Sequence, residues 1–125
     1  MSPSVVRLSI VAVTLFTSAC ASSGAGPRTD RSVITSEQIA QNRYRTAYEA
    51  VEGLHAAWLI TRPDGLTVER EKIVYLDERR LGGIQTLREI AASQILSIRY
   101  IDPATAINRW GVDHGQGVIM VQTRR

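Results

Sequence analysis

Residues 72–90 constrain the fold more than any other part of this chain. They open with an apolar, partly β-branched run at residues 73–76, which is typical of a buried strand. A polar group at residues 77–80 follows, and then two glycines, Gly82 and Gly83. Polar residues favour turns, and glycine permits backbone angles that other residues resist. The order predicts a strand, a turn and a short amphipathic helix.

Residues 1–19 have the organisation of a secretory signal peptide. Arg7 supplies a positive charge, residues 8–16 form an apolar stretch, and small residues lead up to position 19. The apolar stretch is too short for an ordinary membrane span, which takes about 20 residues. We therefore expect residues 1–19 to be removed.

The lone cysteine, Cys20, follows these small residues directly. This arrangement resembles the lipobox of bacterial lipoproteins, in which the cysteine is acylated and becomes the new N-terminus, although Thr17 stands where that family usually has an aliphatic residue. Cys20 is therefore the predicted lipid attachment site. Cleavage after Ala21 is the alternative, because Ala19-Cys20-Ala21 also fits an A-x-A site. One cysteine excludes an internal disulfide and a cysteine-based zinc cluster.

The charge of the chain does not indicate a nucleic-acid partner. The chain has 15 basic and 12 acidic residues, and every base except Lys72 is an arginine. These residues are spread along the sequence, whereas a nucleic-acid interface is clustered and more strongly basic.

Ala21 and Ser22 carry no acidic sorting signal. Resemblance to other lipoproteins therefore implies the outer membrane, with the protein facing the periplasm.

Residues 20–33 are small and polar and include glycine and proline, which predicts a flexible tether.

The folded domain is expected at residues 34–125. Thr35 and Gln38 fit a capping box, with Ser36 as the alternative cap. Apolar residues at helical spacing then predict one amphipathic helix as far as Trp58, with an earlier end at Gly53 as the alternative. Residues 58–61 suggest a short strand, and residues 62–65 a turn.

The C-terminal part adds further elements. Residues 96–101 predict a strand with Leu96, Ile98 and Tyr100 on one face. Asp102 and the proline after it predict a helix start, and Gly111 its end. A glycine-rich loop and a strand at residues 118–121 follow. The whole predicts an α+β domain with a small mixed sheet of about four strands and two or three short helices.

With these elements in place, residues 34–123 resemble the plug domain of TonB-dependent outer-membrane receptors. In that family a strand ends in a small loop, a short helix follows, and a second strand leads to a helix that ends in an aromatic residue and glycine. A glycine-rich turn then enters the last strand. The residues that carry the resemblance are Val74, Tyr75, Leu76, Asp77, Gly82, Gly83, Ile84, Leu87, Arg88, Glu89, Ile90, Ile95, residues 97–101, Pro103, Ala104, Ala106, Trp110, Gly111 and residues 115–121.

The chain departs from the family pattern in several places. Glu78 replaces the usual glycine, which disfavours a turn with positive φ, so a different turn type is expected. Ala91 replaces a frequent proline. A TonB box is not recognisable, and no strands follow from which a membrane barrel could form. The resemblance therefore implies a plug-like fold but not the transport activity of the receptors.

No residue pattern indicates catalysis, a cofactor or a metal. Asp113 and His114 are adjacent in the glycine-rich loop, but no nucleophile is placed beside them by spacing. We expect His114 to bond locally or to water. His55, predicted to pack at a helix boundary, and His114 give no metal-ligand signature. The loop leads into a strand, whereas phosphate loops lead into a helix.

The sequence predicts a protein-binding or scaffolding module that is not an enzyme. We expect its partner to be another envelope protein, bound at an exposed sheet edge by strand addition. The candidate contacts are Asp77, Glu78, Arg79 and Arg80, at a loop tip whose alternating charges also fit a simple solvated loop. Two alternatives stay open: a small hydrolase or sugar-binding enzyme that uses residues 112–117, or the remnant of a truncated receptor.

Overall fold

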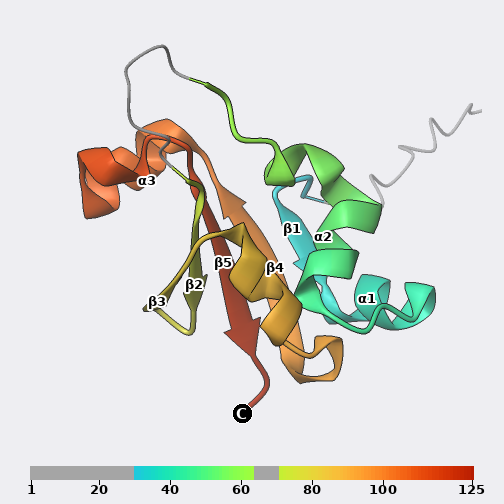
Figure 1. Cartoon of the computed structure of the whole chain (residues 1–125). Coiled ribbons are helices and arrows are strands. Elements are labelled where there is room, and N and C mark those ends of the chain that lie inside the picture. The colour runs from blue at the N-terminus through green and yellow to red at the C-terminus, as the bar shows by residue number, and fades with distance from the viewer. Residues whose placement is uncertain (1–29, 64–70) are drawn as a thin grey trace, which may run out of the picture.

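The protein folds around one five-stranded mixed sheet, with strands in the order β1-β4-β5-β2-β3 (Figure 1). The computed structural model describes residues 30–63 and 71–125. The predicted signal peptide, Cys20, most of the predicted tether and the second half of the predicted turn at residues 62–65 lie outside this part. The strands are β1 (Val33–Thr35), β2 (Ile73–Leu76), β3 (Arg79–Gly82), β4 (Ile95–Ile101) and β5 (Val118–Thr123).

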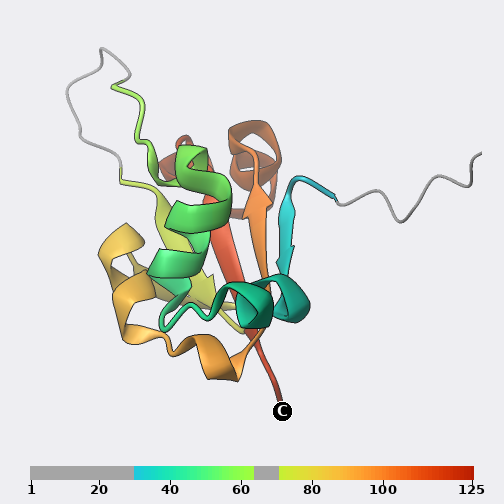
Figure 2. The same ribbon diagram turned by 90° about the vertical axis from the view of Figure 1, so that its right-hand side faces the viewer.

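Short helices cover both faces of the sheet, which confirms the α+β class. One face is covered by α1 (Ser36–Asn42), α2 (Ala47–His55) and the 3₁₀ helices η1 (Ala56–Leu59), η2 (Ile84–Glu89) and η3 (Ala92–Gln94). The other face carries α3 (Pro103–Trp110), which is followed by η4 (Val112–His114). Figure 2 shows α2 in front of the sheet and α3 behind it.

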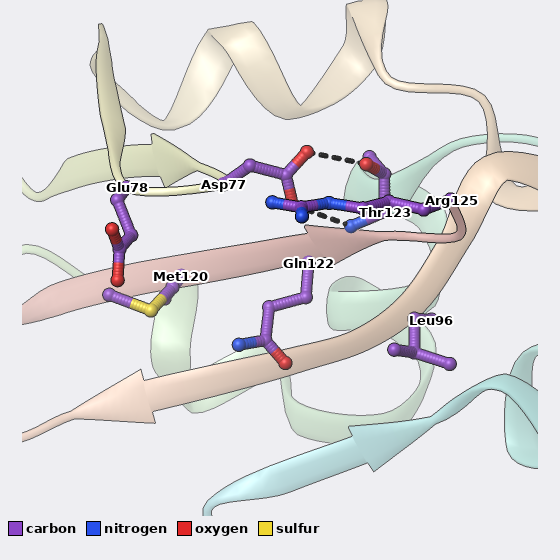
Figure 3. Close-up of a pocket in the computed structure, with 7 residues that line it drawn as sticks. All are labelled: Asp77, Glu78, Leu96, Met120, Gln122, Thr123 and Arg125. Atoms are coloured by element: carbon purple, nitrogen blue, oxygen red, sulfur yellow. Dashed lines mark hydrogen bonds between the residues drawn. The ribbon is translucent and has the colours of Figure 1, made fainter.

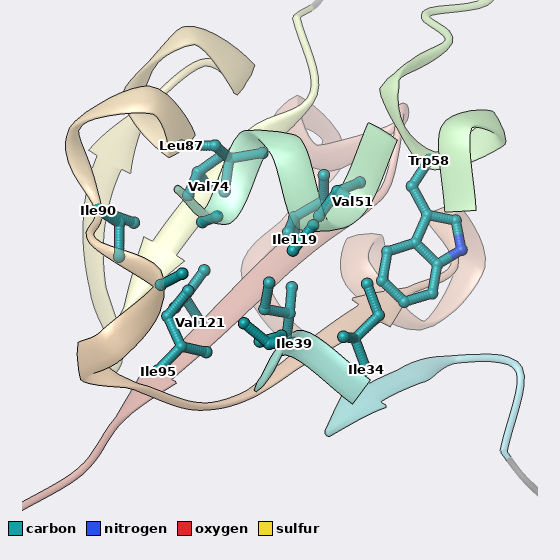
Figure 4. Packing of buried hydrophobic residues seen from close by; sticks show 14 residues of the cluster. Ile34, Ile39, Val51, Trp58, Val74, Leu87, Ile90, Ile95, Ile119 and Val121 are labelled. Carbon is teal, nitrogen blue, oxygen red and sulfur yellow. The ribbon is translucent and has the colours of Figure 1, made fainter. Parts of the chain in front are cut away.

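The central strand β5 is buried on both faces. Ile119 and Val121 point into the larger core beneath α1 and α2, which is drawn in Figure 4. Val118 and Met120 alternate with them and pack on the side of α3. A strand with two buried faces has a continuous apolar run rather than an alternating one. This explains why residues 118–121 could be identified as a strand from sequence.

β2 pairs parallel to β5, whereas the pairs β1–β4, β4–β5 and β2–β3 are antiparallel. β3 was missed in the sequence, where Arg79 and Arg80 were placed in a loop. The sheet also begins earlier than predicted, because Val33 pairs with Arg99. Val33 had been assigned to the tether.

The capping box at the first helix is confirmed. The Thr35 hydroxyl accepts from the Gln38 N–H at 3.4 Å, and the Gln38 side chain accepts from the Thr35 N–H at 2.9 Å. The prediction of one helix as far as Trp58 is wrong. Helix α1 ends at Arg43, which has φ 55°, and α2 begins after a second cap, Thr46.

Pairing with a distant segment explains this break. The N–H of Ala47 donates to the Ile90 carbonyl at 2.9 Å, and the N–H of Ala92 donates to the Arg45 carbonyl at 2.8 Å. Thr46 is therefore extended, and a bridge joins it to Ala91. The long-range bonds take up backbone groups that a continuous helix would have used internally.

The strand predicted at residues 58–61 is also wrong, because the chain continues into η1. The Trp58 side chain is buried and stacks on Tyr100, with ring centroids 5.6 Å apart. His55 stacks on the other side of Trp58 at 4.4 Å, in the packing role expected for it. The tight turn of η1 brings the large Trp58 side chain over the sheet.

The prediction for β4 is correct in position but wrong for Leu96. A register shift between Ile95 and Ser97 marks a β-bulge, and Leu96 is 50% exposed while Ile95 is fully buried. A bulge adds one residue to one strand, which breaks the alternation of faces. By contrast, the Asp102 cap is confirmed, since its carboxylate accepts from the Thr105 N–H at 3.0 Å.

Candidate functional site

Asp77 and Glu78 form a two-residue turn between β2 and β3, in which Leu76 pairs with Arg79. Both turn residues have positive φ, 46° at Asp77 and 72° at Glu78. These signs are those of a type I′ turn, whose twist matches the twist of the paired strands. The expectation that Glu78 would impose another turn type is therefore wrong. The twist of the hairpin outweighs a backbone cost of roughly 1–2 kcal/mol for each such residue.

Hydrogen bonds to the end of β5 hold this turn in place. The Asp77 carboxylate accepts from the Thr123 N–H at 2.9 Å and from the Thr123 hydroxyl. The Asp77 N–H donates to the Val121 carbonyl at 3.0 Å. The Thr123 hydroxyl, then the Thr123 N–H and the positive charge of Arg125 lower the pKa of Asp77 from its ordinary value. Asp77 therefore serves as an anchor for the turn.

A depression of about 430 Å³ lies beside the turn, at the end of β5 (Figure 3). It combines carboxylates, an amide, a guanidinium and apolar groups. Its lining residues are Asp77, Glu78, Leu96, Met120, Gln122, Thr123 and Arg125. Two of the four predicted contact residues therefore belong to one concave surface. Leu96 joins them because the bulge in β4 turns it outward, which sequence reasoning did not anticipate.

The other two predicted contacts, Arg79 and Arg80, lie on β3 and are exposed. β3 is the last strand in the sheet order and pairs with β2 on one side. Neither guanidinium group has a hydrogen bond or ring contact within residues 30–63 and 71–125. The predicted tip is thus a turn followed by an edge strand, whose two positive charges have no partner in the described part of the chain.

The glycine-rich loop holds a histidine in a different setting from the one expected. His114 is 4% exposed, and its Nε2 lies 2.9 Å from the Tyr75 hydroxyl. Its ring also lies against Trp110, at 5.7 Å between centroids. We expected His114 to bond locally or to water. In the structure it bonds to Tyr75 in the smaller core, on the side of the sheet that carries α3, and nothing in the sequence indicated this bond. Asp113 is exposed, so the structure does not bring Asp113 and His114 together at one accessible site.

The buried lysine Lys72 is a second feature that the sequence did not reveal. It is 3% exposed, and its Nζ donates to the Trp58 carbonyl at 2.5 Å and to the Ile60 carbonyl at 3.0 Å. The Nζ also lies 5.2 Å from the centre of the Tyr100 ring. Burial, and then the charge of Arg62, lowers its pKa. Lys72 holds the segment after η1 against the sheet. The one sequence feature that singled out Lys72 was that it is the single lysine of the chain.

Neighbouring contacts fix the same segment. The side-chain amide of Gln116 accepts from the Arg62 N–H at 3.1 Å and donates to the Arg62 carbonyl at 2.7 Å. Gly117 follows with φ 86°, and a Cβ there would meet the Ile101 carbonyl and the Tyr100 hydroxyl at 2.8 Å. The glycine-rich loop therefore serves close packing in this structure.

Within the described ranges, no three His, Cys, Asp or Glu side chains gather into a group that could hold a metal ion. The described helices also include none with the length and apolar character of a membrane span. No known protein family, curated protein or solved structure matches the chain.

Proposed function

We propose that this chain is a lipoprotein of the bacterial outer membrane, anchored at Cys20 and facing the periplasm, whose plug-like domain binds another envelope protein. Two observations support this proposal. The described elements follow the order that the resemblance implies, namely β2, η2, β4, α3 and β5. The proposed contact surface also lies at the end of the sheet farther from the N-terminal tether.

The observation that carries the proposal is the outer edge of β3. An edge strand presents backbone N–H and C=O groups to which an extended peptide can bind by strand addition. Arg79 and Arg80 are exposed on this strand, with guanidinium groups unpaired among the described residues. Opposite charges on paired strands stabilise a sheet, and like charges destabilise it. The edge therefore favours a partner strand with acidic side chains.

The position of the edge relative to the anchor fits this role. The described chain begins beside the end of β4, where the Tyr100 N–H donates to the Ser32 carbonyl at 2.8 Å. The Asp77–Glu78 turn lies beside Thr123, at the opposite end of the sheet (Figure 1). A seven-residue strand such as β4 spans about 23 Å. In a domain tethered through its N-terminus, the hairpin therefore lies at the end of the sheet remote from the attachment point.

Affinity capture from detergent-solubilised envelopes tests the contact surface. We expect the full-length protein to retain an envelope partner and the double variant Arg79→Glu/Arg80→Glu to lose it. The control is Arg31→Glu/Arg43→Glu, which makes the same charge change at two exposed positions outside the hairpin. Equal recovery with the hairpin variant, or recovery of nothing specific with the wild type, would contradict the proposal.

The anchor has its own test. Cys20→Ser should stop labelling by a radioactive fatty acid and release the protein from membranes. Continued labelling of that variant would rule out Cys20 as the attachment site.

A further inference from the structure

The depression beside the hairpin combines an apolar surface with charge. Leu96 is 50% exposed at its edge, and Met120, which is 7% exposed, lies deeper. Figure 3 shows the Glu78, Met120 and Gln122 side chains on the same side of the β5 ribbon. An apolar surface beside a charged group suits a ligand whose body is apolar and whose end is charged.

The charges of the depression are not equally compensated. The Asp77 carboxylate accepts two hydrogen bonds from Thr123 and has Arg125 nearby. Glu78 has no hydrogen bond, ring contact or ion pair within residues 30–63 and 71–125. The side-chain oxygen of Gln122 accepts from the Ser97 hydroxyl at 3.1 Å. Of the two carboxylates in the depression, Asp77 is bonded to Thr123, and Glu78 has no partner among the described residues.

We propose that the depression binds a basic side chain, lysine or arginine, of the partner protein. Its ammonium or guanidinium group pairs with the Glu78 carboxylate, and its methylene groups lie on Leu96 and Met120. Lysine and arginine cover apolar surface in this way while their charged ends remain near water. This inference rests on the proposed function and adds to it. The partner segment carries acidic groups for Arg79 and Arg80 and a basic group for Glu78.

The expected affinity for one such side chain is low. An exposed ion pair strengthens binding only about 1.4- to 5-fold, so most of the affinity for an isolated side chain comes from the buried methylene groups. A single capped amino acid should therefore bind with a dissociation constant on the order of millimolar. The charge preference, not the affinity, identifies the site.

A nuclear magnetic resonance titration of the isotope-labelled, lipidated protein in detergent tests the inference. The probes are Nα-acetyl-lysine N-methylamide and its norleucine counterpart, which lacks the ammonium group. We expect the lysine probe to shift the backbone amides of Glu78, Met120 and Gln122 saturably. The norleucine probe should bind about 1.4- to 5-fold more weakly, as the loss of one exposed ion pair predicts.

Two matched variants complete the test. Glu78→Gln should remove the preference for the lysine probe, and Glu52→Gln, an exposed position on α2, should retain it. Equal binding of the two probes, a preference that survives in Glu78→Gln, or no shift up to about 20 mM would overturn the inference. If the probes fail while charge reversal at Arg79 and Arg80 still abolishes partner capture, the inference falls and the proposed function stands.

Discussion

The Asp77 carboxylate accepts hydrogen bonds from both the N–H and the hydroxyl of Thr123, which lies 46 positions further along the chain. These bonds join the turn after β2 to the end of β5, where the two strands run parallel. The position of this turn determines the direction of the Glu78 side chain and the start of β3. The geometry of the proposed contact surface therefore depends on this one pair of residues.

Thr123→Val should destabilise the domain in a pH-dependent way. The hydrogen bonds from Thr123 lower the pKa of Asp77 in the folded state. Valine keeps the N–H donor and lacks the hydroxyl, whose stabilising contribution is present above the ordinary carboxyl pKa of about 3.9 and is lost as the pH falls through the lower folded-state value. In thermal unfolding followed by circular dichroism, Tm of the variant should lie below that of the wild type at pH 7. The difference should narrow in strong acid.

Thr86→Val provides the control for this measurement. The Thr86 hydroxyl donates to the Gly83 carbonyl at 2.7 Å, and a carbonyl does not titrate. Its effect on Tm should therefore stay constant with pH. A pH-independent difference for Thr123→Val would show that the carboxylate bond does not hold the turn.

Glu78→Gly should stabilise the domain. Glu78 has φ 72°, a conformation that glycine adopts without steric cost. The relief of this strain exceeds the added entropy of the unfolded chain, so we expect a gain of about 0.5–1 kcal/mol. This corresponds to a rise in Tm of a few degrees. Glu52→Gly in α2 should instead lower the free energy of unfolding, by about 1 kcal/mol. A loss of stability in both variants would contradict the turn geometry.

Two glycine substitutions separate backbone strain from steric overlap. Gly111 has φ 102° and ψ 177°, a region nearly restricted to glycine, and open space where a Cβ would lie, so Gly111→Ala should cost about 1–3 kcal/mol. Gly117 has φ 86°, and its Cβ would also meet two oxygens of residues 100–101. Overlap adds about 1–3 kcal/mol, so Gly117→Ala should unfold at a lower urea concentration than Gly111→Ala. Equal midpoints would contradict the close packing at Gly117.

Lys72→Met should be costly although methionine is apolar and similar in length. The carbonyls of Trp58 and Ile60 would lose the donor that they share. A buried acceptor without a partner costs about 1–3 kcal/mol. The exposed Arg31→Met should change the free energy of unfolding by less than about 0.5 kcal/mol. A Lys72→Met protein as stable as the wild type would show that these bonds contribute nothing net.

The sequence predicted best where local chemistry decides the conformation. The Thr35 capping box, the Asp102 cap with Pro103, and the stop at Gly111 depend on residues within one turn of each other, and all are present. The apolar runs of β2 and β5 were equally clear. In each case, residues close together in the sequence were enough to determine the local structure.

Prediction failed where distant segments decide the conformation. Arg45 and Thr46 could continue a helix, but they pair with residues 90–92. The bulge that exposes Leu96 arises from pairing with β5, and no residue type in the sequence indicates it. The bond between Tyr75 and His114 likewise joins segments 39 positions apart. The four hairpin residues of the candidate site could be proposed as contacts from sequence, and their role stays a prediction, whereas the depression needed the bulge and the end of β5.

Photo-crosslinking in living cells tests the central claim most directly. A benzophenone amino acid is placed at position 80, on the exposed edge of β3, or at position 52, on the exposed side of α2. The account predicts a defined adduct with an envelope protein from position 80 and none from position 52. The Arg79→Glu change should reduce the adduct from position 80. No adduct from position 80, or the same adduct from both positions, would contradict the assignment of the hairpin as the partner-binding surface.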